Sequence, residues 1–226
     1  MKHNFDQIIP RKDTHSTKWL KFSDEDVLPM WIADMDFACP SVITNAMTQR
    51  IDQGIFGYTD TPSDLTEVFV SKVYENTEWK IQDDWVVWIP GGVVGLNVSC
   101  KTVLAPGEMA MVPSPIYAPF TEAPENMERG FVKNYLVDSK GRLEFDLEAI
   151  ETILTEDTKM FFLCNPHNPG GTVFSKQEIE KISSICEERK IIVCSDEIHS
   201  DLILEEGLKH VPFASLNKYN EEHSIT

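Results

Sequence analysis

Lys190-Ile191-Ile192-Val193-Cys194-Ser195-Asp196-Glu197-Ile198-His199 is the stretch of sequence that decides the fold. Its apolar, β-branched run ends abruptly in two acidic residues, which is typical of a buried strand in a parallel sheet. Ligands of open α/β sheets bind at the carboxyl edge of such strands. We therefore expect Asp196 to lie at that edge, and our hypothesis is that it meets a cationic ring nitrogen there. The alternative interpretation is that Asp196 and Glu197 open a solvated loop.

The rest of the chain alternates between strand and helix patterns, which predicts an α/β fold with a largely parallel sheet. Short apolar runs predict strands at 85–89, 109–112, 131–137 and 159–164, and 224–226 has the pattern of a further strand. Helices are predicted at 41–53, 64–74, 93–104, 146–154 and from 175 onward. Two of these open with capping boxes, Asp64–Glu67 and Ser175–Glu178. The last helix carries one apolar face, formed by Ile179, Ile182, Ile185 and Cys186.

The amino-acid composition argues against several classes of protein. The 226 residues are 42% hydrophobic and carry a formal net charge of -17, so the chain can bury a core and would repel a nucleic-acid backbone. Its five cysteines, an odd number without a CxxC pair, favour free thiols in a reducing cytoplasm. The N-terminal residues lack a signal-peptide pattern, and no apolar run is long enough to span a membrane. The six histidines form no ligand-spaced pair, so we expect no metal site.

Several predicted strands end in groups that can bind a ligand. Gly91-Gly92-Val93-Val94 follows a predicted strand and opens a helix whose main-chain N–H groups suit a phosphate, although such a tetrapeptide alone is more often a tight turn than an anion site. Tyr117 can stack on a planar ligand or line the rim of the core. In the turn-rich heptapeptide 165–171, Asn168 presents both an amide donor and an acceptor. Asp196, at the end of a predicted strand, adds a carboxylate to these ligand-binding groups.

These groups occur in an order that resembles a known family. The residues that carry the resemblance are 31–37 (WIADMDF), 56–58 (FGY), 91–94 (GGVV), 114–120 (SPIYAPF), 164–171 (CNPHNPGG) and 195–202 (SDEIHSDL). The sequence is similar to the fold-type I pyridoxal-phosphate enzymes of aminotransferase class I/II, and within them to the cystathionine β-lyase (MalY/PatB-like) C–S lyases. The resemblance implies a three-layer α/β/α domain at 46–226, incomplete at its C-terminus. Residues 1–45 would form an N-terminal arm and part of a small domain.

The resemblance also implies roles in binding pyridoxal 5'-phosphate. Val93 and Val94 would give main-chain N–H groups to the cofactor phosphate. Tyr117 would stack on the pyridine ring, and Asn168 would hydrogen-bond its phenolic oxygen. Asp196 would pair with the pyridine nitrogen, which lets the ring absorb electrons.

A further implied role concerns a partner subunit. Tyr58 would reach the cofactor phosphate of the neighbouring subunit, so we expect a homodimer that acts on a small amino-acid substrate. His199 lies close to the implied site and receives no role. We expect His167 and His199 to support their loops.

One required residue has no counterpart in the sequence. The family uses a lysine that forms a Schiff base with the cofactor. Lys209 and Lys218 are the only lysines after Asp196, and neither has the expected sequence context. We therefore expect this lysine beyond Thr226, together with the C-terminal small domain, and identify no catalytic residue within the chain. Residues 217–224 look too polar to end a domain by packing.

Three functions are compatible with this pattern. The first is a lyase that cleaves cystathionine or cysteine S-conjugates to a thiol, pyruvate and ammonia. An aminotransferase of class I/II would share every residue that the resemblance identifies. The third is a non-catalytic fragment, because the chain lacks the Schiff-base lysine.

Overall fold

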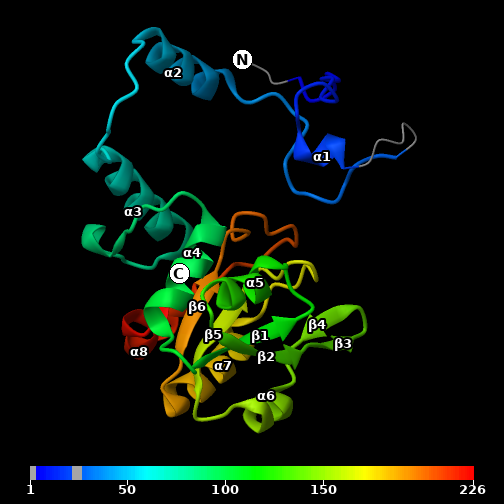
Figure 1. Ribbon diagram of the computed structural model, residues 1–226, viewed down its shortest axis with the longest axis vertical. Helices are drawn as coiled ribbons and strands as arrows, with labels where there is room; N and C mark the ends of the chain where they lie inside the picture. The colour runs from blue at the N-terminus through cyan, green and yellow to red at the C-terminus, as the bar shows by residue number, and fades with distance from the viewer. Residues whose placement is uncertain (1–3, 22–26) are drawn as a thin grey trace. The chain divides into compact units, whose positions relative to one another are not determined.

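The structure is a computed structural model that describes residues 4–21 and 27–226 (Figure 1). Its internal contacts divide the chain into two compact units, Met1–Asp60 and Thr61–Thr226. The predicted boundary at residue 45 concerns the domains of the whole protein and stays a prediction. Within the described residues, no helix is long and apolar enough to cross a membrane.

The described residues of the first unit are mostly irregular and include the helices α1 (Thr17–Leu20) and α2 (Ser41–Asp52). The prediction of α2 is confirmed to within a residue. Pro40 rather than Ser41 is its N-cap, and Gly54 follows its C-terminal end with a φ of 70°. No α2 side chain is buried.

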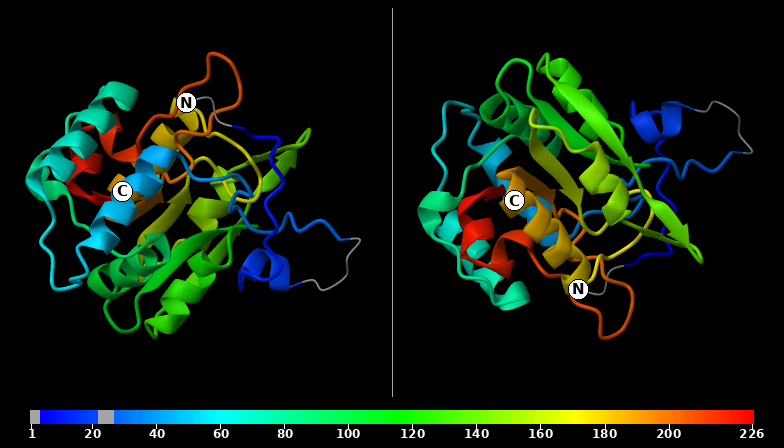
Figure 2. Two further views of the ribbon diagram at one scale, coloured as in Figure 1. Left: turned by 90° about the horizontal axis from the view of Figure 1, so that it is seen from above. Right: turned by 90° about the horizontal axis from the view of Figure 1, so that it is seen from below.

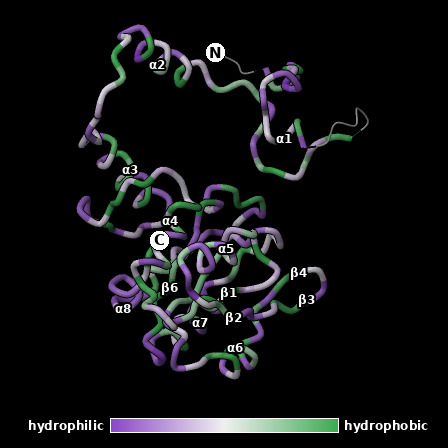
Figure 3. Tube along the Cα trace, in the orientation of Figure 1, coloured by the Kyte–Doolittle hydropathy of each residue, from purple (hydrophilic) through white to green (hydrophobic). Residues whose placement is uncertain are grey.

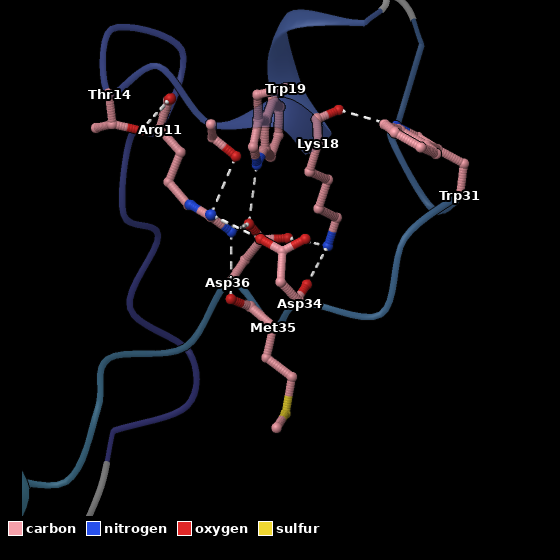
Figure 4. Close-up of polar contacts among 9 residues, drawn as sticks. Arg11, Thr14, Lys18, Trp19, Trp31, Asp34, Met35 and Asp36 are labelled. Carbon is pink, nitrogen blue, oxygen red and sulfur yellow. Dashed lines mark hydrogen bonds and ion pairs between the residues drawn. The ribbon is translucent and has the colours of Figure 1, made fainter. Parts of the chain in front are cut away.

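A polar cluster organises the rest of this unit (Figure 4). The Asp36 carboxylate accepts hydrogen bonds from Lys18 Nζ at 2.8 Å, Trp19 Nε1 at 2.9 Å and Arg11 Nη1 at 2.6 Å. Arg11 also pairs with Asp34 at 2.7 Å. The hydrogen bond from Lys18, followed by those from Trp19 and Arg11, holds the pKa of Asp36 well below its usual range. The cluster therefore fixes the segment around Asp36 against residues 11–19.

The second unit holds most of the regular structure. Its helices are α3 (Ser63–Thr77), η1 (Asp83–Trp85), α4 (Gly92–Val103), α5 (Pro119–Asn126), α6 (Leu147–Ile153), α7 (Lys176–Arg189), η2 (Phe213–Leu216) and α8 (Lys218–Glu222). Its strands are β1 (Met109–Ser114), β2 (Gly130–Tyr135), β3 (Val137–Ser139), β4 (Arg142–Glu144), β5 (Thr158–Cys164), β6 (Ile192–Asp196) and β7 (Ser224–Ile225).

Five strands form one parallel sheet in the order β2-β1-β5-β6-β7, and β3 and β4 form a separate antiparallel hairpin. The sheet separates two apolar clusters. One contains Ile150 of α6 and Ile179 of α7, and the other contains Leu96 of α4 and Phe120 of α5. Helices thus cover both faces of the sheet (Figure 2), and its apolar strands run through the interior (Figure 3). This arrangement confirms the expected α/β fold.

The predicted strand at 85–89 is wrong. Trp85 ends the short helix η1, and residues 86–89 are assigned to no strand. The Trp88 ring instead packs edge-on against Phe69 of α3, and its Nε1 donates to Thr66 Oγ1 at 3.1 Å. Apolar, β-branched residues favour an extended chain, but a strand also needs a hydrogen-bonded neighbour.

The two capping boxes have different outcomes. Ser175 caps α7 as predicted, and its hydroxyl and the Glu178 carboxylate each accept a hydrogen bond from the other residue's main-chain N–H. The box predicted at Asp64 is wrong, because α3 begins at Ser63 with Pro62 as its N-cap. Proline favours the first turn of a helix and has no N–H to be capped.

The polar C-terminal segment packs better than its composition predicts. Asn217 caps α8, and the amide of Asn220 is 2% exposed. Asn220 exchanges hydrogen bonds with the Ser183 hydroxyl of α7 at 2.8 and 3.0 Å. A satisfied buried amide can therefore anchor a segment that contains few apolar residues. The predicted strand that follows is confirmed as β7.

Candidate active site at the carboxyl edge of the sheet

Three neighbouring parallel strands deliver the predicted binding residues to one edge of the sheet. β1 leads to Tyr117, β5 leads to Asn168, and β6 ends at Asp196 itself. The Tyr117 N–H donates to the Asn168 carbonyl oxygen at 3.1 Å, and the Asn165 N–H donates to the Asp196 carbonyl oxygen at 3.0 Å. Main-chain hydrogen bonds therefore join the ends of all three strands.

The N-terminus of α4 reaches the same edge. Residues 104–108 alone connect α4 to β1, so the C-terminal end of α4 lies near the amino edge of the sheet. A helix of 12 residues is about 18 Å long, which carries Gly92, Val93 and Val94 to the carboxyl edge. Their main-chain N–H groups have no partner within the helix. This geometry suits an anion.

The carboxylate of Asp196 lies on the α4 face of the sheet. Side chains alternate along a strand, so Asp196 shares its face with Cys194. Cys194 belongs to the apolar cluster of α4 and contacts Ser99 of that helix. Asp196 is half-buried, and its Oδ1 accepts a hydrogen bond from the Ile198 N–H at 3.1 Å. The other carboxylate oxygen, Oδ2, thus remains available to a ligand at this edge of the sheet.

Hydrogen bonds of the Cys164 and Asn165 side chains hold the turn-rich loop 165–171 in place. Cys164, at the end of β5, accepts the Asn168 N–H at 3.4 Å on its sulfur and donates to the Pro166 carbonyl oxygen at 3.5 Å. Burial raises the pKa of this thiol to about 12, so it remains protonated and able to donate. The side chain of the buried Asn165 accepts the Phe174 N–H at 2.9 Å. These contacts fix the main chain that presents Asn168.

His167 supports this loop, as predicted. Its Nδ1 accepts the Gly170 N–H at 3.2 Å, and its main chain bonds to Gly171 and Thr172 at 2.7 Å. Burial lowers the pKa of the imidazole, which favours the neutral ring that this acceptor role needs. His199 lies in the turn that follows Asp196, and the prediction that it supports its loop remains untested.

A buried acid–base pair next to Asp196 was not predicted. Glu197 Oε2 lies 2.6 Å from His210 Nε2, and its Oε1 accepts from Ser195 Oγ at 2.7 Å and from the Phe213 N–H at 2.9 Å. The two paired side chains are 10% and 4% exposed, respectively. No local spacing rule connects residues 13 apart across a loop, so the acidic Glu197 beside Asp196 was the only signal of this pair in the sequence.

A cavity of about 520 Å³ opens beside Asn168. One wall is the loop 166–173, and the other contains His199, Leu202 and Leu208. Val93, Tyr117 and Asp196 do not line it. Asn168 is thus the one predicted binding residue of the second unit that lines this cavity, and the other binding residues lie outside its wall.

Tyr58, Lys209 and Lys218 are the remaining candidates. Tyr58 belongs to the first unit and is fully exposed. Lys209 is exposed, and Lys218 pairs with Glu221 at 2.6 Å and with Glu222 at 3.4 Å. The hydrogen bond to Glu221 raises the pKa of Lys218, which does not favour a nucleophile. Across residues 4–21 and 27–226, no group of three or more His, Cys, Asp or Glu side chains could hold a metal ion.

Comparison with known proteins identifies the family. The profile of aminotransferase class I and II matches residues 25–224. This chain belongs to the aminotransferase class I and II family. The family member cystathionine beta-lyase PatB of Bacillus subtilis is 41% identical over 229 residues, which cover 99% of this chain and 59% of PatB. The chain thus spans about three-fifths of the length of that relative.

Solved structures of family members share the fold. A crystal structure of OvoB superposes with a TM-score of 0.93 and 41% identity, covering 98% of this chain and 58% of OvoB. The PLP-bound C–S lyase of Staphylococcus hominis superposes with a TM-score of 0.88 and 31% identity, covering 96% of this chain and 56% of the lyase. The layered α/β arrangement and its parallel sheet are therefore those of the family's pyridoxal-phosphate proteins.

Proposed function

We propose that the intact protein is a pyridoxal-phosphate-dependent carbon–sulfur β-lyase. Its substrates would be cystathionine or related cysteine S-conjugates, and its products a thiol, pyruvate and ammonia. The observation that carries the proposal is the Asp196 carboxylate at the end of β6, in a chain 41% identical to a cystathionine beta-lyase. Because the chain spans 59% of PatB, the proposed activity concerns the whole protein.

The chemistry of the edge fits a phosphorylated, cationic aromatic ring. The N–H groups of Val93 and Val94 at the start of α4 would bind the phosphate, since a helix N-terminus carries partial positive charge. Asp196 would bind the ring nitrogen. A half-buried carboxylate with one oxygen turned toward the Ile198 N–H can still accept a proton-bearing nitrogen on the other.

Tyr117 and Asn168 would orient the ring between these two ends. The Tyr117 side chain is about half exposed at the edge, which leaves its ring face open to stacking. The Asn168 side chain would donate its amide N–H to the phenolic oxygen. The hydrogen bond between their main chains fixes the spacing of the two groups before any ligand binds.

The cofactor, when bound, supplies an electron sink for reactions at the α-carbon of an amino acid. The role of Asp196 is to keep a proton on the ring nitrogen, because an ionised carboxylate favours a charged partner. Val93 and Val94 would hold the phosphate end of the cofactor, and Asp196 would hold its ring nitrogen. Proton removal from the substrate would fall to a lysine beyond Thr226.

We also propose that the protein is a cytoplasmic homodimer. Tyr58 would extend to the cofactor phosphate of a second subunit, which accords with a side chain that has full solvent exposure. All five cysteines are free thiols, which favours a reducing compartment.

An assay of product formation tests the proposal. The intact protein, loaded with pyridoxal phosphate, is incubated with cystathionine, and pyruvate and free thiol are measured with and without an added α-keto acid. Equal amounts of pyruvate and thiol without the keto acid are expected of the lyase. Turnover that depends on the keto acid would overturn the proposal of a lyase and favour an aminotransferase. Absence of both turnover and cofactor binding would favour a non-catalytic protein.

A further inference from the structure

The Glu197 carboxylate is more fully bound than the carboxylate of Asp196 before it. Its two oxygens make three contacts of 2.6–2.9 Å, to Ser195, His210 and the Phe213 N–H. The Glu197 and His210 side chains are almost completely buried. The cofactor roles assigned above use none of these four residues.

Glu197 and Asp196 point to opposite sides of the backbone. The hydrogen bond from Ser195 to Glu197 puts those two side chains on one side, as expected for residues two apart in an extended chain. Asp196 lies on the other side, with Cys194 and α4. Fixing the Glu197 side chain therefore fixes the rotation of the backbone that aims Asp196.

The same contacts close the loop that follows β6. Glu197 at its start binds His210 and Phe213 beyond its end, so residues 198–209 form a loop with a closed base. This loop contributes His199, Leu202 and Leu208 to the cavity beside Asn168. Its remaining side chains are mostly exposed, so the loop is held by its buried base and by a hydrogen bond of 3.0 Å that the Asn76 amide of α3 donates to Asp201.

We propose that Glu197, held by His210, is a positioning residue that orients the Asp196 carboxylate toward the cofactor's ring nitrogen. The inference rests on the proposed function. Replacement of the carboxylate by an amide disturbs the contact with the His210 ring, and removal of the whole Glu197 side chain also leaves the Phe213 N–H without an acceptor in a buried place, which costs free energy. The turn after β6 then relaxes, and Asp196 loses its fixed direction.

The ring nitrogen itself reports the orientation of Asp196. The intact protein is loaded with pyridoxal phosphate labelled with ¹⁵N in the ring, and the chemical shift of that nitrogen measures its protonation. Glu197→Gln keeps the size of the side chain and the acceptor for Ser195 and Phe213, whereas Glu197→Ala removes all three contacts. His210→Gln removes the imidazole and so disrupts the Glu197–His210 pair while keeping Glu197.

Glu178→Gln is the matched control. Glu178 is also a carboxylate with Arg and Ser partners at 2.7–2.8 Å, but it lies at the start of α7 and touches neither Asp196 nor the turn after β6. Thermal unfolding of each variant, followed by circular dichroism, shows how much stability it has lost. Comparison with the control separates lost stability from lost orientation.

We expect the ring nitrogen to be less protonated in Glu197→Gln and His210→Gln than in the wild type, and less again in Glu197→Ala. The affinity for pyridoxal phosphate should fall about tenfold in the first two, the equivalent of one hydrogen bond to a charged group. Glu178→Gln should keep the wild-type signal. Wild-type signals in all the folded variants would overturn this inference alone. A wild-type protein that binds no pyridoxal phosphate would overturn the proposed function as well.

Discussion

The main-chain N–H of Tyr117 donates to the carbonyl oxygen of Asn168 at 3.1 Å, which joins the loop after β1 to the loop after β5. Their parent strands are direct neighbours in the sheet. Two residues that lie 51 positions apart in the sequence are thus held next to one another by their main-chain atoms. Substitution of either side chain should leave this frame intact, which makes the site suitable for point variants.

Substitution of Asp196 should weaken cofactor binding. Asp196→Ala removes the partner of the ring nitrogen, and a hydrogen bond to a charged group contributes about 1.5–3 kcal/mol. Isothermal titration of the intact apoprotein with pyridoxal phosphate measures the loss. Asp157→Ala is the control, because Asp157 is an exposed aspartate just before β5, at the opposite edge of the sheet. Equal affinities in the two variants would contradict the role of Asp196.

The two glycines before Val93 should respond differently to alanine. Gly91 has φ 113° and ψ 154°, a region open almost only to glycine, so Gly91→Ala should lower the free energy of unfolding by about 1–3 kcal/mol. Gly92 begins α4 without a positive φ, and a Cβ there meets no atom within 4 Å. Gly92→Ala should therefore be neutral or slightly stabilising. Urea unfolding of both variants checks the difference, and a tolerant Gly91 would contradict it.

Acid should destabilise the protein partly through Glu178. Burial acts to raise the pKa of this carboxyl, but hydrogen bonds from Arg142 and Ser175 outweigh it and lower the pKa from 4.5 to about 2. A pKa that is lower in the folded state contributes stability above pH 4.5, and this stability is lost as the pH falls toward 2. The wild type should therefore lose more stability than Glu178→Gln between pH 6 and about pH 3. Urea unfolding across this range measures the difference, and parallel curves would refute it.

The cysteines should differ sharply in reactivity. Cys39 is exposed, whereas the other four cysteines are buried. Burial raises the pKa to about 12 for Cys164 and Cys186, and the thiolate is the reactive form. One thiol per chain should react rapidly with a disulfide reagent in the native state, and all five should react in denaturant. If more than one thiol per chain reacts rapidly in the native protein, the core must open and expose a buried cysteine.

The elements that the sequence predicted well are those whose signal is local. β5 and β6 are continuous apolar runs that end in polar residues, and the Ser175–Glu178 box needs only its own four residues. The order of the strand ends then brought Tyr117, Asn168 and Asp196 to one edge, because parallel strands share a carboxyl edge.

The features that sequence reasoning did not predict depend on contacts between residues from different segments of the chain. Whether Trp85–Ile89 becomes a strand is decided by a neighbour elsewhere in the chain, and Trp88 packs on α3 instead. The partner of Glu197 lies beyond a loop, and that of Asp36 lies near residue 18 in another segment. Such contacts leave no periodic pattern, so single-sequence reasoning has no means to find them.

The unpaired stretch Val86–Ile89 also affects how the chain behaves in concentrated solution. Val87, Trp88 and Ile89 are exposed, and no strand pairs with this extended segment within residues 27–226. An unpaired apolar segment is a template for association with a second molecule. The net charge of -17 opposes such association, and dissolved salt screens that repulsion. Aggregation of these 226 residues should therefore be governed by ionic strength, with low salt keeping them dispersed.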